Sequence, residues 1–548
     1  MLDNDPAAEE VIRRYDRAVG DRGNWESQWE EIAKRVLPNY SGSFHGHGMT
    51  RAQGEKRTEE MVDASAALAL TRFAAVMESM LTPRNSRWHR CVPSDKGLLK
   101  NRMSRLWFEE LTDALFRYRY APKANYASQQ HENYLGLGAF GTGCIFIDKL
   151  GGSDRNVKGL RYRATHLGGI HFLENFQGII DTAFRKFERT ARQAVQEFGE
   201  ANLPEAIRKA AADSAKSETK FWFIHCIKPR ADEAGYDKER KDAKGMPFAS
   251  RYVSIEGKKT VKEGGFNSFP YAISRYVVAP GELYGRSPAM LALPAIKVLN
   301  EQKRTVLKQG HRAVDPVLLL HDDGVLDTFS LKPGATNYGG VSADGKPLVH
   351  TLPVGRLDLA REMMDAERAV INDAFLITLF QILVETPTMT ATEVLERTRE
   401  KGILLSPTMG RQQSESLGPQ IEREVDLIMQ QGLVSPMPQM LREAMGEFDI
   451  EYDSPLSRAQ KAEEAAGLFR TVDWLTNTIN ITQDPSPLDH IDFDAAVPDI
   501  LDIQAVPIRW QRSLDRVQEI REGRAQAAEQ RQVVEAAPAL ASVAKAAA

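Results

Sequence analysis

Two long segments with helical periodicity enclose a short segment rich in glycine, and this order constrains the fold more than any other feature of the chain. The first helix is expected at 287–313, because Ser287 can cap it and Pro288 suits its first turn. The second is expected at 354–383, where apolar residues recur every three or four positions. The intervening residues 314–353 hold short strand-like stretches between glycines. The pattern predicts two antiparallel helices that project a small β unit.

The two expected helices differ in charge, since the first is basic and the second is mainly acidic. The candidate pairing residues of the first helix are Lys303, Arg304, Lys308 and Arg312. Those of the second helix are Asp358, Glu362, Asp365 and Glu367. Two interpretations stay open: independently solvated faces, or basic and acidic faces that meet within one subunit or between neighbouring copies. Such pairs favour one register more than they add stability.

The remaining sequence predicts an α+β fold that is predominantly helical. Residues 1–143 show helical spacing of apolar residues, and residues 144–286 switch to the alternation typical of strands. Helical spacing returns at 390–434. Residues 435–548 contain a strand-like stretch, further helices and a tail rich in alanine and glutamate. The chain therefore combines several helical segments with one β-rich lobe.

A proline interrupts the apolar pattern after the second long helix. Pro387 ends that helix, and Thr390 and Glu393 form a capping box that starts the next one. The short connection carries one charge among small and apolar side chains. Its residues are Val384, Glu385, Thr386, Pro387, Thr388 and Met389. We expect a loop whose mobility is confined to these few positions.

Three glycines, Gly136, Gly138 and Gly141, reproduce the GxGxxG spacing of dinucleotide-binding folds. Those folds require a strand, then the glycine turn, then a helix. Here helical periodicity precedes the glycines and a strand-like stretch follows them. We interpret them as a helix C-terminus, where glycine permits a positive φ and close packing.

A near match to a phosphate-binding loop lies in the glycine-rich insert. Gly340, Gly345 and Lys346 fit the pattern, but Pro347 replaces the Ser or Thr whose hydroxyl would hold Mg²⁺. The residues that follow resemble a strand rather than a helix. A tight turn between strands is therefore the better interpretation.

Two groups of residues could bind a metal ion. His45 and His47 are close together, but no Cys or carboxylate cluster accompanies them at zinc-site spacing. The second group could serve a two-metal nuclease only with partners from elsewhere in the fold. It comprises Asp489, His490, Asp492 and Asp494. A surface loop and a solvated turn are the favoured interpretations, and we expect no catalytic residue, cofactor or metal site.

Composition limits the classes of function. The formal net charge of −4 provides no broad basic surface for nucleic acid, although it is compatible with a locally charged channel. The separated cysteines Cys91, Cys144 and Cys226 fit a reducing compartment. The acidic start has no signal-peptide pattern, and the apolar run at 374–380 is too short to span a bilayer. We expect a cytosolic protein, or one assembled from the cytosol.

Several stretches, taken in order, resemble the head-to-tail connector, or portal, proteins of short-tailed bacteriophages. The resemblance extends from about Asn24 to Gly432. It includes LTPRNSRWHR, YLGLGAFGTGCIFID, SFPYAISRYVVAPGELYGRSPAM, LNEQKRTVLKQGHRAVDP, MTATEVLERTREKG and LSPTMGRQQSE. The resemblance is specific because these stretches are many and keep the order of the family, whereas later residues match less clearly.

The resemblance implies a portal-type fold that assembles into a closed ring with a central channel, usually a dodecamer, at one vertex of the capsid. It also implies a division of the chain into named regions. The wing would comprise 1–143, 144–286 and 390–434, the stem 287–313 and 354–383, the clip 314–353, the channel loop 384–389 and the crown 435–548.

The resemblance further implies a function and partners. Double-stranded DNA would pass through the channel during packaging and ejection, without sequence-specific contacts. The terminase large subunit, tail adaptor proteins, capsid protein and scaffolding protein would dock on the ring. The ring would be a virion component assembled in the host cytoplasm, without a membrane and without enzymatic activity. Two alternatives remain, namely another structural, tail or scaffold component of the virion, and a nuclease that uses the cluster at 489–494.

Overall fold

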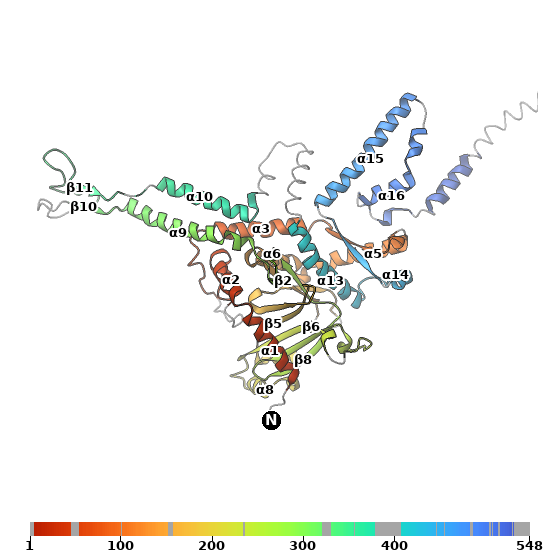
Figure 1. Cartoon of the computed structure of the whole chain (residues 1–548), viewed down its shortest axis with the longest axis horizontal. Helices are drawn as coiled ribbons and strands as arrows, with labels where there is room; N and C mark the ends of the chain where they lie inside the picture. Colours follow the sequence, from red (N-terminus) through yellow and green to blue (C-terminus); the bar gives the residue numbers. More distant parts are fainter. Residues whose placement is uncertain are drawn as a thin grey trace, which may run out of the picture. The chain divides into compact units, whose positions relative to one another are not determined.

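The computed structural model (Figure 1) describes most of the chain. The described residues are 5–44, 54–99, 101–151, 157–233, 236–320, 330–353, 355, 357–378, 407–444, 446–453, 455–482, 486–503, 506, 508–512, 516–528 and 530. They belong to two compact units, and both units mix helices and strands. The first unit comprises Met1–Thr82, Pro122–Arg155 and Leu160–Asp426, and the second comprises Pro83–Ala121, Asn156–Gly159 and Leu427–Ala548.

Four helices from the first part of the chain belong to the first unit. They are α1 (Pro6–Gly20), α2 (Gly23–Val36), α3 (Ser65–Leu81) and α6 (Tyr126–Phe140). Asp5 caps α1, because its side chain accepts the backbone N–H groups of Ala7 and Ala8 at 3.1 Å. The small residues of α3 allow close packing on α6, where a Cβ added to Gly138 would lie 2.6 Å from Leu70 Cδ1.

Helix α6 ends at Gly141, which has a φ of 76° and donates its N–H to the Leu137 carbonyl at 3.0 Å. This conformation confirms that the GxGxxG glycines form a helix C-terminus. The chain then enters β2 (Thr142–Lys149), which is the central strand of an antiparallel sheet in the order β3-β2-β9. The outer strands are β3 (Leu160–Ala164) and β9 (Tyr271–Arg275).

The predicted β-rich lobe also contains a five-stranded antiparallel sheet in the order β4-β5-β6-β7-β8. Its strands are β4 (Ile170–Glu174), β5 (Ile180–Thr190), β6 (Lys220–Pro229), β7 (Phe248–Ser254) and β8 (Lys259–Phe266). Two short helices, α7 (Ala191–Phe198) and α8 (Glu205–Ala212), follow β5. The capping box of Thr190 and Gln193 starts α7.

Alternation along the strands sends apolar side chains to both faces of this sheet. Phe187 and Phe223 pack with residues of α7 and α8 in one core cluster. Phe184 and Ile224, each an odd number of positions away on the same strands, pack with residues of α1 in another. Both faces of the sheet are therefore covered, and the lobe is a rigid support for the segments attached to it.

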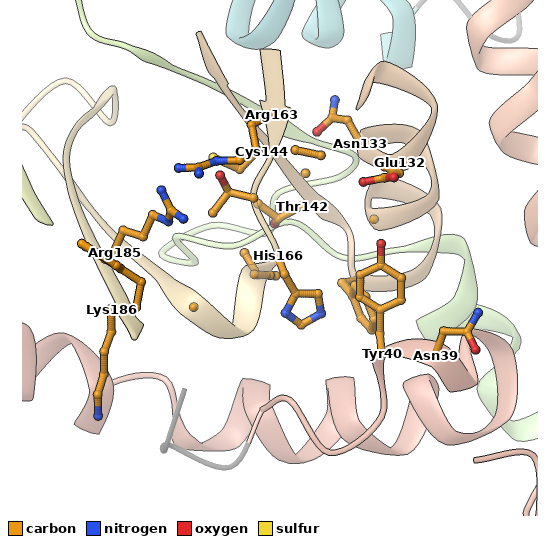
Figure 2. Close-up of a pocket in the computed structure, with 18 of the residues that line it drawn as sticks. Asn39, Tyr40, Glu132, Asn133, Thr142, Cys144, Arg163, His166, Arg185 and Lys186 are labelled. Carbon is orange, nitrogen blue, oxygen red and sulfur yellow. The ribbon is translucent and has the colours of Figure 1, made fainter. Parts of the chain in front are cut away.

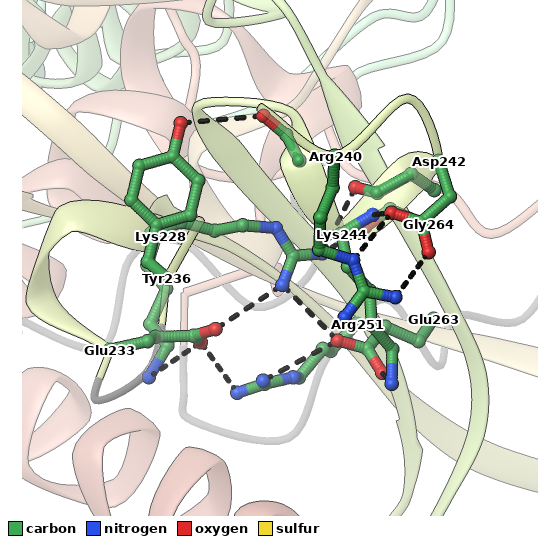
Figure 3. A network of polar contacts seen from close by, with 12 residues as sticks. Lys228, Glu233, Tyr236, Arg240, Asp242, Lys244, Arg251, Glu263 and Gly264 are labelled. Atoms are coloured by element: carbon green, nitrogen blue, oxygen red, sulfur yellow. Dashed lines mark hydrogen bonds and ion pairs between the residues drawn. The ribbon is translucent and has the colours of Figure 1, made fainter. Parts of the chain in front are cut away.

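A network of charged side chains fixes the segment after β6 to the sheet (Figure 3). Glu233 contacts Arg251 at 2.8 Å and Lys228 at 3.3 Å. Arg230 contacts Glu263 at 3.3 Å and donates a hydrogen bond to the Gly264 carbonyl at 2.8 Å. Because each carboxylate binds more than one cation, the network orders this connection more firmly than a single exposed ion pair would.

The two long helices flank a small β unit, as the sequence predicts (Figure 1). Helix α9 (Pro288–Val314) is capped by the Ser287 hydroxyl, which accepts the Met290 N–H at 3.0 Å. The insert contains the antiparallel strands β10 (Leu318–Leu320) and β11 (Val349–Thr351). Helix α10 spans Leu357–Ala374, and Leu376, with a left-handed φ of 59°, interrupts the helix predicted at 354–383. The predicted end at 383 lies outside the described residues.

The chain continues through a π-helical turn at Gln413–Leu417 into α13 (Gly418–Gln430). The second unit contains α4 (Lys96–Leu99), α5 (Arg102–Arg119), α14 (Gln439–Glu443), α15 (Pro455–Thr482) and α16 (Phe493–Ile503). Its strands β1 (His89–Pro93) and β12 (Phe448–Tyr452) pair antiparallel. The sequence predicts β12 and α15 correctly, but it gives β1 no strand signal. In the described ranges, no helix is both long and apolar enough to cross a membrane.

Candidate functional site

The hairpin of α9 and α10 is the candidate functional segment, because its outer part is exposed although it is rich in apolar residues. The two helices lie side by side, and β10 and β11 lie beyond their ends (Figure 1). The buried residues of α9 all lie between Pro288 and Asn300. The first half of α9 is therefore embedded in the first unit, and the second half extends from it.

An asparagine holds the embedded half of α9 in place. Asn300 is buried, and its Oδ1 accepts the backbone N–H groups of Val62 at 2.8 Å and Asp63 at 2.9 Å. Its Nδ2 donates to the Ile296 carbonyl within α9 at 2.8 Å. The segment that precedes α3 is thus bonded directly to α9.

A buried carboxylate joins the same segment to both helices of the hairpin. The Asp63 side chain is 3 % exposed, and its Oδ2 contacts Lys303 Nζ of α9 at 3.1 Å and Arg368 Nη2 of α10 at 2.9 Å. Its Oδ1 accepts the Ser65 N–H at 2.8 Å at the start of α3. Asp63 therefore ties three helices together, and we call Asp63, Asn300, Lys303 and Arg368 the Asp63 anchor.

The electrostatics of the anchor favour the ionised carboxylate. Burial alone would raise the pKa of Asp63, but the hydrogen bonds from Ser65, Arg368 and Lys303 outweigh it and hold the pKa well below its ordinary value. The carboxylate is therefore negative at neutral pH and compensates two cations. Sequence patterns alone do not identify Asp63 as a contact residue, because its only local signal is the Asp-x-Ser spacing ahead of a helix.

The structure gives several predicted charge-pairing residues a partner within the chain. Lys303 pairs with Asp63, Arg304 pairs with Glu301 of its own helix at 2.7 Å, and Asp365 pairs with Arg368 at 2.8 Å. Four others are exposed on the hairpin. They are Lys308, Arg312, Asp358 and Glu362. The ion pairs of Lys303, Arg304 and Asp365 thus bind α9 to the start of α3 or stay within one helix.

Apolar side chains also lie exposed along the hairpin. On α10, Met364 and Ile371 are buried, whereas Met363 and Val370 are 51 % and 54 % exposed. On α9, Leu307 is 51 % exposed. Leu291, Val298 and Leu359 are exposed as well. On α10, Leu359, Met363 and Val370 share one face and form a second apolar stripe besides the buried one, which is unusual for a surface helix. On α9, Leu307 lies on the opposite face from Val298, so the exposed apolar residues of that helix do not form a continuous stripe.

The β unit beyond the hairpin is too small to be stable by itself. Three residue pairs join β10 to β11, from Leu318 opposite Thr351 to Leu320 opposite Val349. Leu319 and Leu320 are exposed. In the same insert Val341 and Pro347 form a bridge around a turn at Ser342–Gly345, where Gly345 N–H donates to the Ser342 carbonyl at 2.9 Å. This turn confirms the interpretation of the phosphate-loop-like sequence.

Other candidate residues have structural contacts or lie outside the described part of the chain. Asp492 caps α16 by accepting the Asp494 N–H at 2.9 Å, and Asp494 pairs with Arg521 at 2.6 Å. Among the described residues, no group of three His, Cys, Asp or Glu side chains is arranged to hold a metal ion. Outside the described residues lie His45, His47, the predicted loop Val384–Met389 and the cap residues Thr390 and Glu393.

Comparisons with known proteins agree with the predicted family. The profile of the family described as bacteriophage head to tail connecting protein matches residues 8–510. The portal protein of Salmonella phage epsilon15 is 26 % identical over 544 residues, which cover 98 % of this chain and 94 % of that protein. The probable portal protein of Bordetella phage BPP-1 is 29 % identical over 491 residues, which cover 88 % of this chain and 85 % of that protein. These matches do not favour the nuclease or the tail and scaffold alternatives.

One solved structure covers 73 % of this chain and 84 % of its own, described as the neck of an empty GTA particle computed with C6 symmetry. Its TM-score of 0.32 and sequence identity of 10 % are too low to inform the fold. Membership rests on the profile, which matches well over half of the chain, and the sequence resemblance is confirmed. The chain belongs to the family of bacteriophage head-to-tail connecting proteins.

Proposed function

We propose that copies of this phage connector protein assemble into a closed portal ring through the α9–α10 hairpin. The apolar stripe of α10 and the exposed Leu307 of α9 carry this proposal. Burial of one large aliphatic side chain contributes about 1.5–3 kcal/mol, so these residues on the two sides of an interface supply a substantial driving force. In a cyclic ring every copy has two different interfaces, which matches a hairpin with apolar residues on both helices.

Charge adds a preferred orientation to this interface. The exposed Lys308 and Arg312 lie on α9, and the exposed Asp358 and Glu362 lie on α10. If α9 of one copy faces α10 of the next, opposite charges meet around the apolar residues and fix the register. The open edges of β10 and β11 are then available to strands of neighbouring copies.

Introduction of a charge among the exposed apolar residues of the hairpin is expected to disrupt the ring. Leu307→Glu or Met363→Glu places a carboxylate in the proposed interface, and burial of an unpaired charge there costs several kcal/mol. We expect the purified variants to be monomers or small oligomers, whereas Leu307→Met and Met363→Leu form the same ring as the native chain. Mass photometry and negative-stain images measure the outcome. A native chain that stays monomeric or dimeric, also alongside scaffolding protein, contradicts the ring.

The channel of such a ring would be the conduit for double-stranded DNA during packaging and ejection. A chain with a net charge of −4 favours weak contacts that do not depend on sequence, which DNA needs in order to slide. We propose that the ring lies at one vertex of the capsid in the virion, where terminase, tail adaptor, capsid and scaffolding proteins dock. The wing, stem, clip and crown regions named above belong to this proposal.

The segment Val384–Met389 is proposed to be the channel loop at the inner end of the stem. Deletion of Glu385–Met389, or addition of charge there, is expected to leave ring assembly intact and to lower the amount of DNA packaged or retained. Negative-stain images of the ring and quantification of packaged DNA in particles separate the two effects. Normal packaging with the shortened loop would show that this segment does not face DNA.

A further inference from the structure

A cavity of about 440 Å³ lies in the first unit (Figure 2), and no residue of α9 or α10 lines it. Its walls come from α6, β2, β3, β5 and the segment that links β3 to β4. A volume of this size fits a small metabolite rather than a single ion. No role in ring formation or DNA passage accounts for it.

Two arginines converge on one end of this cavity. Arg163 of β3 and Arg185 of β5 point toward one another in Figure 2. Within the ranges that the structure describes, neither guanidinium has a carboxylate within ion-pair distance or a hydrogen-bond acceptor. Their described contacts are with rings, since Arg163 Cζ lies 5.8 Å from the Phe146 centroid and Arg185 Cζ lies 5.4 Å from the Phe187 centroid. Arg163 is exposed and Arg185 is half-buried, so water screens part of the repulsion between them. Two neighbouring cations without a carboxylate partner still favour an anionic ligand between them.

The other groups at this end of the cavity do not neutralise the arginines. Glu188 contacts Lys220 Nζ at 3.0 Å, and Glu132 is an exposed residue of α6 on the far side of the cavity in Figure 2. Cys144 is buried, and burial raises the pKa of its thiol although Arg185 acts in the opposite direction. The thiol is therefore neutral and leaves the positive charge uncompensated.

The remaining wall offers neutral donors and aromatic surface. In the described part of the chain, Thr165 Oγ1 and Asn133 Nδ2 are buried without a hydrogen-bond partner. Tyr40 and His166 also line the cavity and stack with ring centroids 4.7 Å apart. Phe140 and Trp222 add further apolar surface. Buried polar groups without partners carry a cost that a ligand with matching groups would remove.

We propose that this cavity binds a small phosphorylated molecule with a planar ring, of nucleoside monophosphate size. Arg163 and Arg185 bind the phosphate through paired N–H donors, which is the arrangement that guanidinium groups favour for phosphate. The planar ring occupies the aromatic part of the cavity, where it meets Tyr40 and its neighbours.

Titration of the full-length protein with dAMP tests this site. Isothermal calorimetry and thermal unfolding are expected to show binding with a Kd of about 1 mM or lower, and inorganic phosphate alone binds more weakly because it lacks the ring. Arg163→Gln and Arg185→Gln each weaken dAMP binding about tenfold or more. Arg163→Lys and Arg185→Lys retain the charge but lose the paired donors, so they bind with intermediate affinity. Arg208→Gln, which changes an exposed arginine of α8 outside the cavity, is the matched control with unchanged affinity.

Thermal unfolding without ligand distinguishes a binding role from a structural role. Removal of an uncompensated charge is expected to leave the Tm of the free protein unchanged or higher, whereas loss of a structural arginine lowers it. The proposal is overturned by a Tm decrease in both the Gln and the Lys variants. It is equally overturned by the absence of dAMP and phosphate binding up to about 10 mM, or by equal affinity in all variants. The same titration on Leu307→Glu tests the cavity independently of ring assembly.

Discussion

Gly141→Ala is expected to lose about 4 kcal/mol or more of the free energy of unfolding, which is enough to prevent folding of a marginally stable unit. Two effects add at this position. The φ of 76° disfavours any residue with a Cβ, and an added Cβ would lie 2.1 Å from the Gly285 carbonyl oxygen. The obstacle is backbone on the segment that leads into α9, so it cannot rotate away as a flexible side chain could.

Gly178→Ala separates the two effects. Gly178 has the same φ of 76°, but nothing lies within 4 Å of an added Cβ. We expect this control to lose only about 1 kcal/mol, the cost of the left-handed conformation alone. Chemical denaturation of both purified variants, followed by circular dichroism, measures the difference. Equal losses would show that the contact between Gly141 and Gly285 does not constrain the fold.

The elements that the sequence predicts correctly are those encoded by neighbouring residues. Ser287 and Pro288 indicate the start of α9. The period-two alternation of apolar residues predicts the strands of the β-rich lobe. The order of helix, glycines and strand around Gly141 is enough to reject a dinucleotide site. In each case the deciding interactions span a few positions, so the local pattern contains the information.

The features that the sequence does not predict depend on residues far apart in the chain. Strand β1 exists because it pairs with β12, and Arg90 of β1 donates to Glu451 at 2.7 Å across 361 positions. Asp63 contacts Lys303 and Arg368, which lie 240 and 305 positions away. The paired arginines of the cavity come from different sheets. Such contacts arise from tertiary packing, which propensity and periodicity do not encode.

The opposite charges on the two hairpin helices are a further case in which the sequence pattern does not determine which residues pair. The sequence is compatible both with solvated charges and with charges that meet another helix. In the single chain, Lys303 meets a carboxylate that precedes α3, and Lys308 and Arg312 stay exposed. Pairing of these exposed charges with a neighbouring copy therefore belongs to the proposed ring and not to the single chain. Simultaneous charge reversal at Lys308 and Glu362 tests whether the two residues interact across the proposed interface.

Asp63→Asn is expected to lower the free energy of unfolding by about 2–3 kcal/mol. It is also expected to increase hydrogen exchange in α9 and α10, because it weakens the contacts that hold both helices to the first unit. Asparagine retains the size of the side chain and an acceptor for the Ser65 N–H. It leaves Lys303 and Arg368 without their shared negative charge, and loss of one partner from a fully buried pair costs about 3–5 kcal/mol. The loss here is smaller because Lys303 and Arg368 are each about one third exposed.

Acid should reproduce this effect in the native chain. The pKa of Asp63 is lower in the folded protein than in the unfolded chain, so its contribution is complete above the ordinary carboxyl pKa of about 4 and is lost as pH falls toward the folded value. Asp63→Asn is therefore expected to remove part of the acid sensitivity below about pH 4. Denaturant unfolding as a function of pH, together with hydrogen exchange of α9 and α10, measures both consequences.

Glu301→Gln is the matched control for the Asp63 prediction, because it also removes one carboxylate that pairs with a cation of α9. The Glu301 side chain is 69 % exposed and pairs with Arg304 within the same helix. Such exposed pairs contribute about 0.5 kcal/mol or less, so stability and hairpin exchange are expected to change little. If both variants lose the same stability, or if Asp63→Asn leaves hairpin exchange unchanged, burial of Asp63 does not anchor α9 and α10. A loss of stability in Asp63→Asn but not in Glu301→Gln would instead show that the Asp63 anchor fixes the position of the hairpin on the first unit. The anchor would then determine how the hairpin is presented to neighbouring copies in the proposed ring.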